Sequence, residues 1–273
     1  MEDRIALEIR EGVADVRLVR SEKMNALDDA MFEALIQTGE RLKSEPGVRA
    51  AVLSGEGRAF CAGLDMGNFA KMGAVKPAGS GEAKPAGGGR LAARTHGIAN
   101  RPQYAAWIWR EVPVPVIAAV HGVAFGGGLQ VMLGADLRYA APDTRFCVME
   151  MKWGLVPDMA GTQLMRHLAR EDVVRELTYT GRIFSAEEAL GLGFVTRLCD
   201  DPRAAALETA REIASKNPDA IRAAKRILND APYADAARGL MAESTEQDLL
   251  IGTANQIEAV KANLEKRAPE FRD

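Results

Sequence analysis

The sequence predicts an α/β protein whose core is a layered or spiral arrangement of repeated strand–strand–helix units. Two nearly continuous apolar runs, residues 48–53 and 115–121, have the length and composition of strands that are buried on both faces. The second run leads into the triple glycine at 126–128 and a short helical segment. Towards the C-terminus glycines become sparse and helical patterns dominate. We therefore expect an α/β core over residues 1–200 and a helical oligomerisation region over 201–273.

The N-terminal part of the chain predicts a hairpin followed by a helix. Apolar and charged side chains alternate over residues 5–9 and again over 16–18, with a turn at Glu-Gly 11–12 between them. This alternation is typical of a β-hairpin with one solvent-facing side. Asp28 then has the residue type of an N-cap, and the Pro-Gly pair at 46–47 ends the helix that it begins.

Further strand and helix patterns follow in the second half of the chain. Residues 137–140 predict a strand and 161–169 a helix. Ser185 and the Asn-Pro pair at 217–218 have the residue types of helix N-caps, and an amphipathic pattern continues to about residue 264. A helical tail of this kind either packs on a neighbouring subunit or covers its own core, and we expect an oligomer.

Composition excludes several classes of protein. Of the 273 residues 47% are hydrophobic, and the formal net charge of −3 gives no overall attraction for nucleic acid or an anionic membrane. Cys61, Cys147 and Cys199 are far apart and in no CxxC pair, which predicts reduced thiols and no zinc site. Neither a signal peptide nor an apolar run of about 20 residues is present. We expect a soluble cytoplasmic protein without a metal.

One segment differs in composition from the rest. Residues 73–89 are rich in Gly, Ala and Pro, which predicts a surface loop that is either a lid over a ligand or a tolerated insertion. A predicted helix follows it and carries Tyr104, Trp107 and Trp109. Those aromatic side chains either line a pocket or pack in the core.

Two glycine-containing turns are the first candidates for a functional site. The segment Phe-Cys-Ala-Gly-Leu-Asp at 60–65 and the glycines at 126–128 each follow a predicted buried strand. Small residues at a strand end let a ligand approach the backbone, and Leu64 could present a free N–H there. The glycines lack the Lys-Ser/Thr of a P-loop and the spacing of a dinucleotide site. Together the two turns are able to supply the converging donors of an oxyanion hole.

Glu150 and Asp158 are the candidate proton carriers. Gly154 and Pro157 between them argue against a continuous helix, so both acids are expected on an irregular loop among methionine, tryptophan, leucine and valine side chains. Such apolar surroundings raise a carboxyl pKa toward the range that a general acid or base requires. Alternatively, either acid caps the helix at Gly161 or forms an ion pair with a nearby Lys or Arg.

Five motifs that occur in order along the chain resemble those of the crotonase (enoyl-CoA hydratase/isomerase) superfamily; they are RSEKMNAL, AFCAGLD, PVIAAVHGVAFGGG, ADLRYAAPDTRF and EMKWGLVPDMAGTQ. The resemblance implies a spiral of ββα units with C-terminal helices that build a homo-trimer, often paired into a hexamer. It also implies an acyl-CoA substrate. No metal or redox cofactor is implied, because coenzyme A enters as part of the substrate.

The resemblance also assigns roles to individual positions. The backbone N–H groups of Leu64 and Gly127 would hold the thioester oxygen and stabilise the enolate formed by proton abstraction next to it. A further set of residues would lie along the adenine and pantetheine of coenzyme A; it comprises Lys23, Met24, Ala62, Asp65 and Met66.

The acids determine which reaction the resemblance implies. Superfamily hydratases use two glutamates, and Glu150 matches the second of them, whereas the first position holds Gln130. A glutamine cannot exchange a proton, although it could orient a water. Asp158 lies eight residues after Glu150, as in the superfamily's dienoyl-CoA isomerases, in which an acid pair moves a proton along the acyl chain.

We therefore expect double-bond isomerisation of an enoyl- or dienoyl-CoA with Glu150 and Asp158 as the proton carriers. One alternative is an enoyl-CoA hydratase that adds water to a 2-enoyl-CoA. A more remote alternative is a non-catalytic relative that binds acyl-CoA or RNA. The paired acids in apolar surroundings argue against that alternative, and the acidic net charge argues against RNA.

Overall fold

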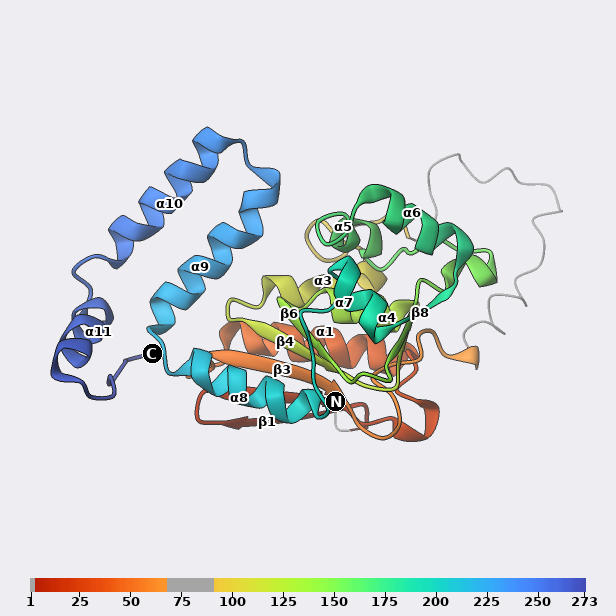
Figure 1. Ribbon diagram of the computed structural model, residues 1–273, viewed down its shortest axis with the longest axis horizontal. Coiled ribbons are helices and arrows are strands. Elements are labelled where there is room, and N and C mark those ends of the chain that lie inside the picture. The colour runs from red at the N-terminus through yellow and green to blue at the C-terminus, as the bar shows by residue number, and fades with distance from the viewer. Residues whose placement is uncertain (1–2, 68–90) are drawn as a thin grey trace.

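A computed structural model of the protein describes residues 3–67 and 91–273, and its centre is a six-stranded sheet (Figure 1). Its strands, in spatial order, are β1 (Ile5–Arg10), β2 (Val13–Leu18), β3 (Ala50–Gly55), β4 (Val116–Val120), β6 (Leu137–Ala140) and β9 (Arg197–Leu198). Strand β1 is antiparallel to β2, and every other neighbouring pair is parallel. A second, three-stranded sheet consists of β5 (Val123–Phe125), β7 (Arg145–Cys147) and β8 (Ile183–Ser185).

Helices surround these sheets and extend beyond them. In the α/β part they are η1 (Ser21–Lys23), α1 (Asp29–Ser44), α3 (Arg101–Glu111), α4 (Gly127–Leu133), η2 (Glu150–Trp153), α5 (Gly161–Met165), α6 (Glu171–Thr180) and α7 (Ala186–Leu192). The remainder are α8 (Pro202–Ala214), α9 (Pro218–Asp230), η3 (Ala231–Tyr233), α10 (Ala236–Leu250) and α11 (Ala254–Glu265). The predicted α/β class is confirmed, whereas a domain boundary at residue 200 stays a prediction.

The main sheet is covered on both faces, which explains its buried strands. Successive side chains of a strand point to opposite faces. In β3, Ala51 and Leu53 join the large core with α1 and α3, whereas Ala50 and Val52 pack against α8. The predicted solvent-facing side of the hairpin is wrong for β2, which is buried along most of its length. The cause is α8, whose Arg203 pairs with Asp15 of β2 from 188 positions away.

Local signals located most helix starts correctly. The Asp28 carboxylate accepts a hydrogen bond from Met31 N at 2.8 Å, and Ser185 Oγ accepts one from Glu188 N at 3.1 Å. Helix α5 is shorter than the predicted 161–169, because the N–H of Leu168 bonds Met165 O and tightens the chain into a turn. The low-complexity segment 73–89 lies outside the described residues.

Helices α9, α10 and α11 form the C-terminal arm, which extends away from the sheet in Figure 1. Helix α9 is joined to the core by the buried Lys225, whose Nζ donates to Trp109 O at 3.1 Å and Val114 O at 2.9 Å. Helix α10 has no buried residue. In the part of the chain that the structure describes, no helix has the length and apolar character needed to cross a bilayer.

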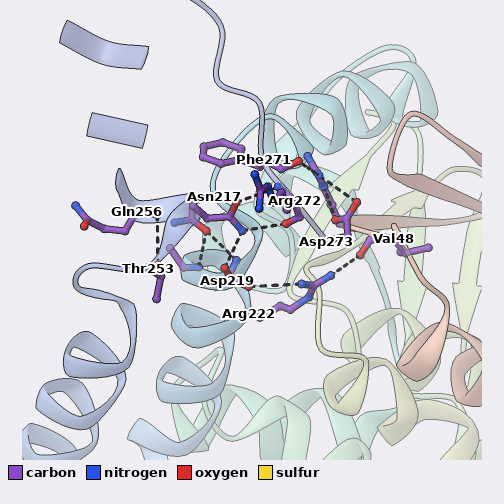
Figure 2. A network of polar contacts seen from close by, with 12 residues as sticks. Val48, Asn217, Asp219, Arg222, Thr253, Gln256, Phe271, Arg272 and Asp273 are labelled. Atoms are coloured by element: carbon purple, nitrogen blue, oxygen red, sulfur yellow. Dashed lines mark hydrogen bonds and ion pairs between the residues drawn. The ribbon is translucent and has the colours of Figure 1, made fainter. Parts of the chain in front are cut away.

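Polar contacts fix the base of the arm to the beginning of β3 (Figure 2). Arg222 of α9 donates to Val48 O at 3.2 Å. Arg49 Nε donates to the Asp273 carboxylate at 2.8 Å, and its Nη2 donates to Phe271 O at 3.1 Å. The C-terminal end of the chain therefore returns to the sheet, while α10 stays remote from it.

Candidate active site

The two predicted glycine turns lie side by side. Cys61 N donates to Val123 O at 3.1 Å and Phe125 N donates to Cys61 O at 3.1 Å, so the first turn pairs with the strand that precedes the second. Gly63 has φ +89°, and a Cβ there would lie 2.6 Å from Phe125 O. Only glycine fits at that position, because a side chain would require a rare backbone conformation and would separate the turns.

The backbone N–H groups of Leu64 and Gly127 take no part in the hydrogen bonds of their own bridge and helix. Leu27 N donates to Gly63 O and Asp65 N donates to Leu27 O, at 2.8 and 3.0 Å. In a parallel bridge the flanking residues make these bonds, so the N–H of Leu64 itself points to the other side. Gly127 is the first residue of α4 and has no carbonyl four residues earlier within the helix.

Both donors remain available for a ligand. In residues 3–67 and 91–273, neither the N–H of Leu64 nor that of Gly127 makes a hydrogen bond. A Cβ on Gly63 would lie 3.7 Å from Gly127 N, which places the two turns within reach of one small group. Met159 packs over Gly127, where a Cβ would lie 2.8 Å from its sulfur atom. Met159 had no predicted role, because a methionine next to an acid has no distinctive sequence pattern.

Glu150 faces the second turn from η2. Its side chain is buried, and a Cβ on Gly126 would lie 3.2 Å from its Oε1. Gln130 Nε2 donates to the same Oε1 at 2.6 Å, while Oε2 is buried with no hydrogen-bond partner among the described residues. Burial raises the pKa of Glu150, and the charge of Asp158 raises it further. One carboxylate oxygen is thus anchored and the other is free to exchange a proton.

The amide of Gln130 connects both acid-bearing segments. Its Oε1 accepts hydrogen bonds from Met159 N and Gly161 N, each at 2.8 Å, while its Nε2 donates to Glu150. A glutamate at this position would place a second charge beside Glu150. The predicted orientation of a water by Gln130 stays a prediction, and the structure adds a role in fixing the loop that carries Asp158.

Asp158 lies on that loop with its side chain open to solvent. Partial burial raises its pKa. The alternative in which Asp158 or Glu150 pairs with Lys152 or Arg166 is wrong, because no such ion pair occurs among the described residues. Neither acid caps α5 with its side chain, since its N-cap is Ala160 without a side-chain hydrogen bond. Both expected pKa increases are confirmed in direction.

Comparison with known proteins shows what this arrangement resembles. A sequence profile described as enoyl-CoA hydratase/isomerase matches residues 8–86 and 89–273. The chain belongs to the enoyl-CoA hydratase/isomerase family. The crystal structure of an enoyl-CoA hydratase from Bacillus anthracis is similar, with a TM-score of 0.85, 29% identity and coverage of 98% of both chains. The crotonase-like fold that the motifs implied is therefore confirmed.

Relatives with different activities have similar identity to this enoyl-CoA hydratase/isomerase family member. The mitochondrial Delta(3,5)-Delta(2,4)-dienoyl-CoA isomerase of Mus musculus is 31% identical over 93% of this chain and 77% of its own length. The (E)-benzylidenesuccinyl-CoA hydratase of Thauera aromatica is 31% identical over 98% of both chains. Sequence identity alone does not distinguish an isomerase from a hydratase, so the reaction has to be inferred from the two acids.

The residues expected along coenzyme A come from two chain segments that lie next to each other. Ala62 N donates to Met24 O at 2.9 Å, which places the segments of these two residues next to each other. Lys23 ends η1 with an exposed side chain, and Met66 is also exposed. The Met24 and Ala62 segments therefore meet near Leu64, while binding of coenzyme A along them stays a prediction.

Asp65 differs from the other residues expected along coenzyme A because its carboxylate already accepts two hydrogen bonds within the protein. It accepts hydrogen bonds from Gly67 N and from Arg20 Nη1, both at 2.7 Å, and these contacts hold the pKa of Asp65 below its usual range. Two further residues of this turn had no predicted role: Arg20, and Asn25, whose buried Nδ2 donates to Ala59 O at 2.8 Å. Both residues lie within the RSEKMNAL motif, which indicated the family but did not assign a role to either side chain.

Cysteine or metal chemistry finds no support among the described groups. Burial raises the pKa of Cys61 to about 12 and that of Cys147 to about 11, so both are protonated thiols near neutral pH. Within residues 3–67 and 91–273 no cluster of three or more His, Cys, Asp or Glu side chains could hold a metal ion. Independence from a cofactor stays a prediction.

Proposed function

We propose that this protein isomerises a double bond in the acyl group of an enoyl- or dienoyl-CoA, with Glu150 and Asp158 as proton carriers. One observation carries the proposal. The buried Glu150 has a free carboxylate oxygen at the glycine turn that offers an unpaired backbone N–H, and a second acid lies on the loop that Gln130 ties to it. The family supplies the coarser statement that the substrate is an acyl-CoA.

The chemistry follows from the positions of these groups. With the thioester oxygen between the N–H groups of Leu64 and Gly127, removal of a proton from the activated carbon leaves an enolate. Two preorganised donors stabilise that oxyanion, each contributing about 3 kcal/mol by analogy with other oxyanion holes. The carbon–hydrogen electron pair moves into the conjugated system, and a proton returns to a carbon farther along. No water is consumed.

One acid can accept a proton while the other donates one, because the charge of Asp158 affects the protonation of Glu150. A charge on Asp158 raises the pKa of Glu150, which favours a protonated Glu150 while Asp158 is ionised. The ionised member removes a proton from the acyl group, and the protonated member returns one at a more distant carbon. After one turnover the pair has exchanged roles, and redistribution of the proton restores it.

Hydration is the second candidate function, because several relatives are named as hydratases. The two-glutamate route lacks its first glutamate, and the oxygen of Gln130 at that position already accepts two backbone hydrogen bonds. We therefore place isomerisation first. A non-catalytic RNA-binding protein would instead retain labelled RNA in a filter-binding assay at low salt.

We also propose that the C-terminal arm packs on further copies of the chain, as a trimer or a pair of trimers. Helix α10 has no buried residue, and Leu240, Met241 and Leu249 on it are all mostly exposed. An apolar helix surface of this kind is stable when another surface covers it.

An ultraviolet assay of the purified protein tests the function directly. We expect growth of the conjugated 2,4-dienoyl absorbance from a 3,5-dienoyl-CoA and no loss of the enoyl absorbance of crotonyl-CoA. Asp158→Asn should lower the isomerase rate at least about 100-fold, because the amide cannot carry the proton. Asp172→Asn on α6, an exposed acid paired with Arg170, is the matched control. Rapid hydration of crotonyl-CoA or full turnover by Asp158→Asn would overturn the proposal.

A further inference from the structure

A cavity of about 900 Å³ opens at Ala160, two residues after Asp158. Its walls come from the end of α1, from α3 and the segment before it, from the start of α5 and from the corner between α9 and α10. Ala160 and Gln163 line it directly after the loop of Asp158, and Ile98 and Trp107 give it apolar surface. The cavity is therefore near enough to the Asp158 loop to receive the far end of an acyl group.

Positive charge exceeds negative charge around the cavity. Five cationic side chains line it, but only two acidic ones, Glu111 and Asp230. Three of the cations have a carboxylate partner; the pairs are Lys43–Glu111 at 3.1 Å, Arg238–Asp230 at 2.9 Å and Arg226–Glu246 at 2.6 Å. Arg94 and Arg110 are left without an acidic partner among the described residues.

Arg110 is the better placed of these two cations. It is half-buried, its Nη2 donates to Asn229 Oδ1 at 2.7 Å, and its guanidinium lies over the Trp107 ring at 5.9 Å. The charge of Arg110 also contributes to lowering the pKa of both Lys225 and His167. A fixed, half-buried cation without a counter-charge is costly, and an anionic ligand would remove that cost.

We propose that the cavity holds the distal end of an acyl group that carries a carboxylate there, with Arg110 as its partner. The inference rests on the proposed function and adds the chemical class of the substrate to it. The apolar chain would lie along Ile98 and Trp107, and the planar guanidinium suits a carboxylate by donating two N–H groups to its two oxygens.

Binding of unreactive acyl-CoA pairs tests this inference in the full-length protein. Each pair has equal chain length and differs only at the far end, as in hexanoyl- and adipoyl-CoA, valeryl- and glutaryl-CoA, and octanoyl- and suberoyl-CoA. By calorimetry, we expect at least one carboxylated member to bind about tenfold or more tightly than its partner, as a charge-assisted contact predicts. Arg110→Met should abolish this preference, and Arg110→Lys should retain part of it.

Two controls separate the outcomes. Arg170→Met removes an exposed arginine on another face and should leave every preference unchanged. Asn229→Ala removes the anchor of Arg110 while keeping its charge, and should reduce the preference without eliminating it. Together, these two variants show whether a lost preference reflects the Arg110 charge or a general loss of folding.

Binding of coenzyme A without an acyl group shows whether Arg110 binds a phosphate of coenzyme A or the carboxylate of the acyl group. If Arg110→Met weakens coenzyme A as much as adipoyl-CoA, the guanidinium binds a phosphate and the inference is wrong. Wild-type protein that binds acyl-CoA without discriminating within any pair would also overturn the inference while leaving the proposed function intact. Failure of every coenzyme A compound to bind would overturn the proposed function and the inference together.

Discussion

The acid site and the C-terminal arm are incomplete in opposite ways. At the acid site the Glu150 side chain is buried, but one of its carboxylate oxygens and the N–H groups of Leu64 and Gly127 lack partners in the described residues. On α10 no residue is buried, and Leu249 is 67% exposed. The site therefore lacks polar partners of the kind that a small ligand supplies, whereas the arm lacks an apolar surface of the kind that another protein chain supplies.

Rigidity differs between these regions as well. The site is built from glycine turns whose backbones touch, and the Gln130 amide locks the two acid-bearing segments together. The arm is fixed at its base by the contacts in Figure 2 and by Lys225, while α10 depends on its neighbouring helices. Substitutions in the site should therefore affect chemistry or packing, and substitutions in α10 should affect assembly.

Replacing Glu150 should have the largest effect. Glu150→Gln keeps the size of the side chain and a hydrogen bond to Gln130, but it cannot exchange a proton. We expect the isomerase rate to fall about 1000-fold with an unchanged circular dichroism spectrum, since general acid–base groups contribute about 100- to 10,000-fold. The initial rate with a 3,5-dienoyl-CoA measures this. A variant that retained wild-type turnover would remove Glu150 from the mechanism.

A pair of glycine substitutions compares packing in the two regions. In Gly128→Ala the new Cβ would lie 2.4 Å from the backbone oxygen of Cys61, so we expect a loss of about 3 kcal/mol in the free energy of unfolding. In Gly239→Ala, within α10, nothing lies within 4 Å and the helix should gain about 0.5–1 kcal/mol. Urea unfolding measures both. Equal effects would contradict the contrast between a tightly packed site and an open arm.

Assembly should respond to the apolar surface of α10. Leu249→Lys places a charge where we propose contact with another copy, and burying a leucine side chain contributes about 1.5–3 kcal/mol. The variant should dissociate at concentrations about 10- to 100-fold higher than wild type in analytical ultracentrifugation. Tyr179→Lys, on the 62% exposed position of α6, serves as the control. A monomeric wild-type protein at all concentrations would show that α10 has no such partner.

Sequence patterns predicted features that depend on neighbouring residues. The Asp28 cap, the buried strand β3 and the glycine turns all follow from local composition, and so does the higher pKa of the acids. Glu150 itself is buried as the apolar sequence around it suggested, but Met151, Trp153, Leu155 and Val156 between the two acids are exposed.

Features that depend on distant residues were missed. The burial of β2 requires α8, which no pattern within the hairpin indicates. The hydrogen bonds of Gln130 to the Met159 loop span 29 and 31 positions, and the cavity at Arg110 requires α9 to fold back on α3. Such juxtapositions are set by the packing of whole elements, so a single sequence without structural information does not reveal them.

The smallest expected effect concerns stability rather than rate, and it distinguishes the buried acid of the site from an exposed acid at the surface. Burial raises the folded-state pKa of Glu150 above its ordinary value of 4.5, so the charged form is disfavoured in the folded protein. The unfolded state then releases its proton first as the pH rises, and wild type loses stability between the two pKa values. Glu150→Gln has no such proton, so its free energy of unfolding relative to wild type should increase with pH and level off above the raised pKa. A pKa difference of one corresponds to about 1.4 kcal/mol.

Urea unfolding between pH 4 and 8 measures this difference in stability between Glu150→Gln and wild type, with Glu187→Gln on the exposed first turn of α7 as the control. A difference that is constant across this range would show that Glu150 ionises as readily in the folded protein as in the unfolded chain, and the argument from burial would be wrong.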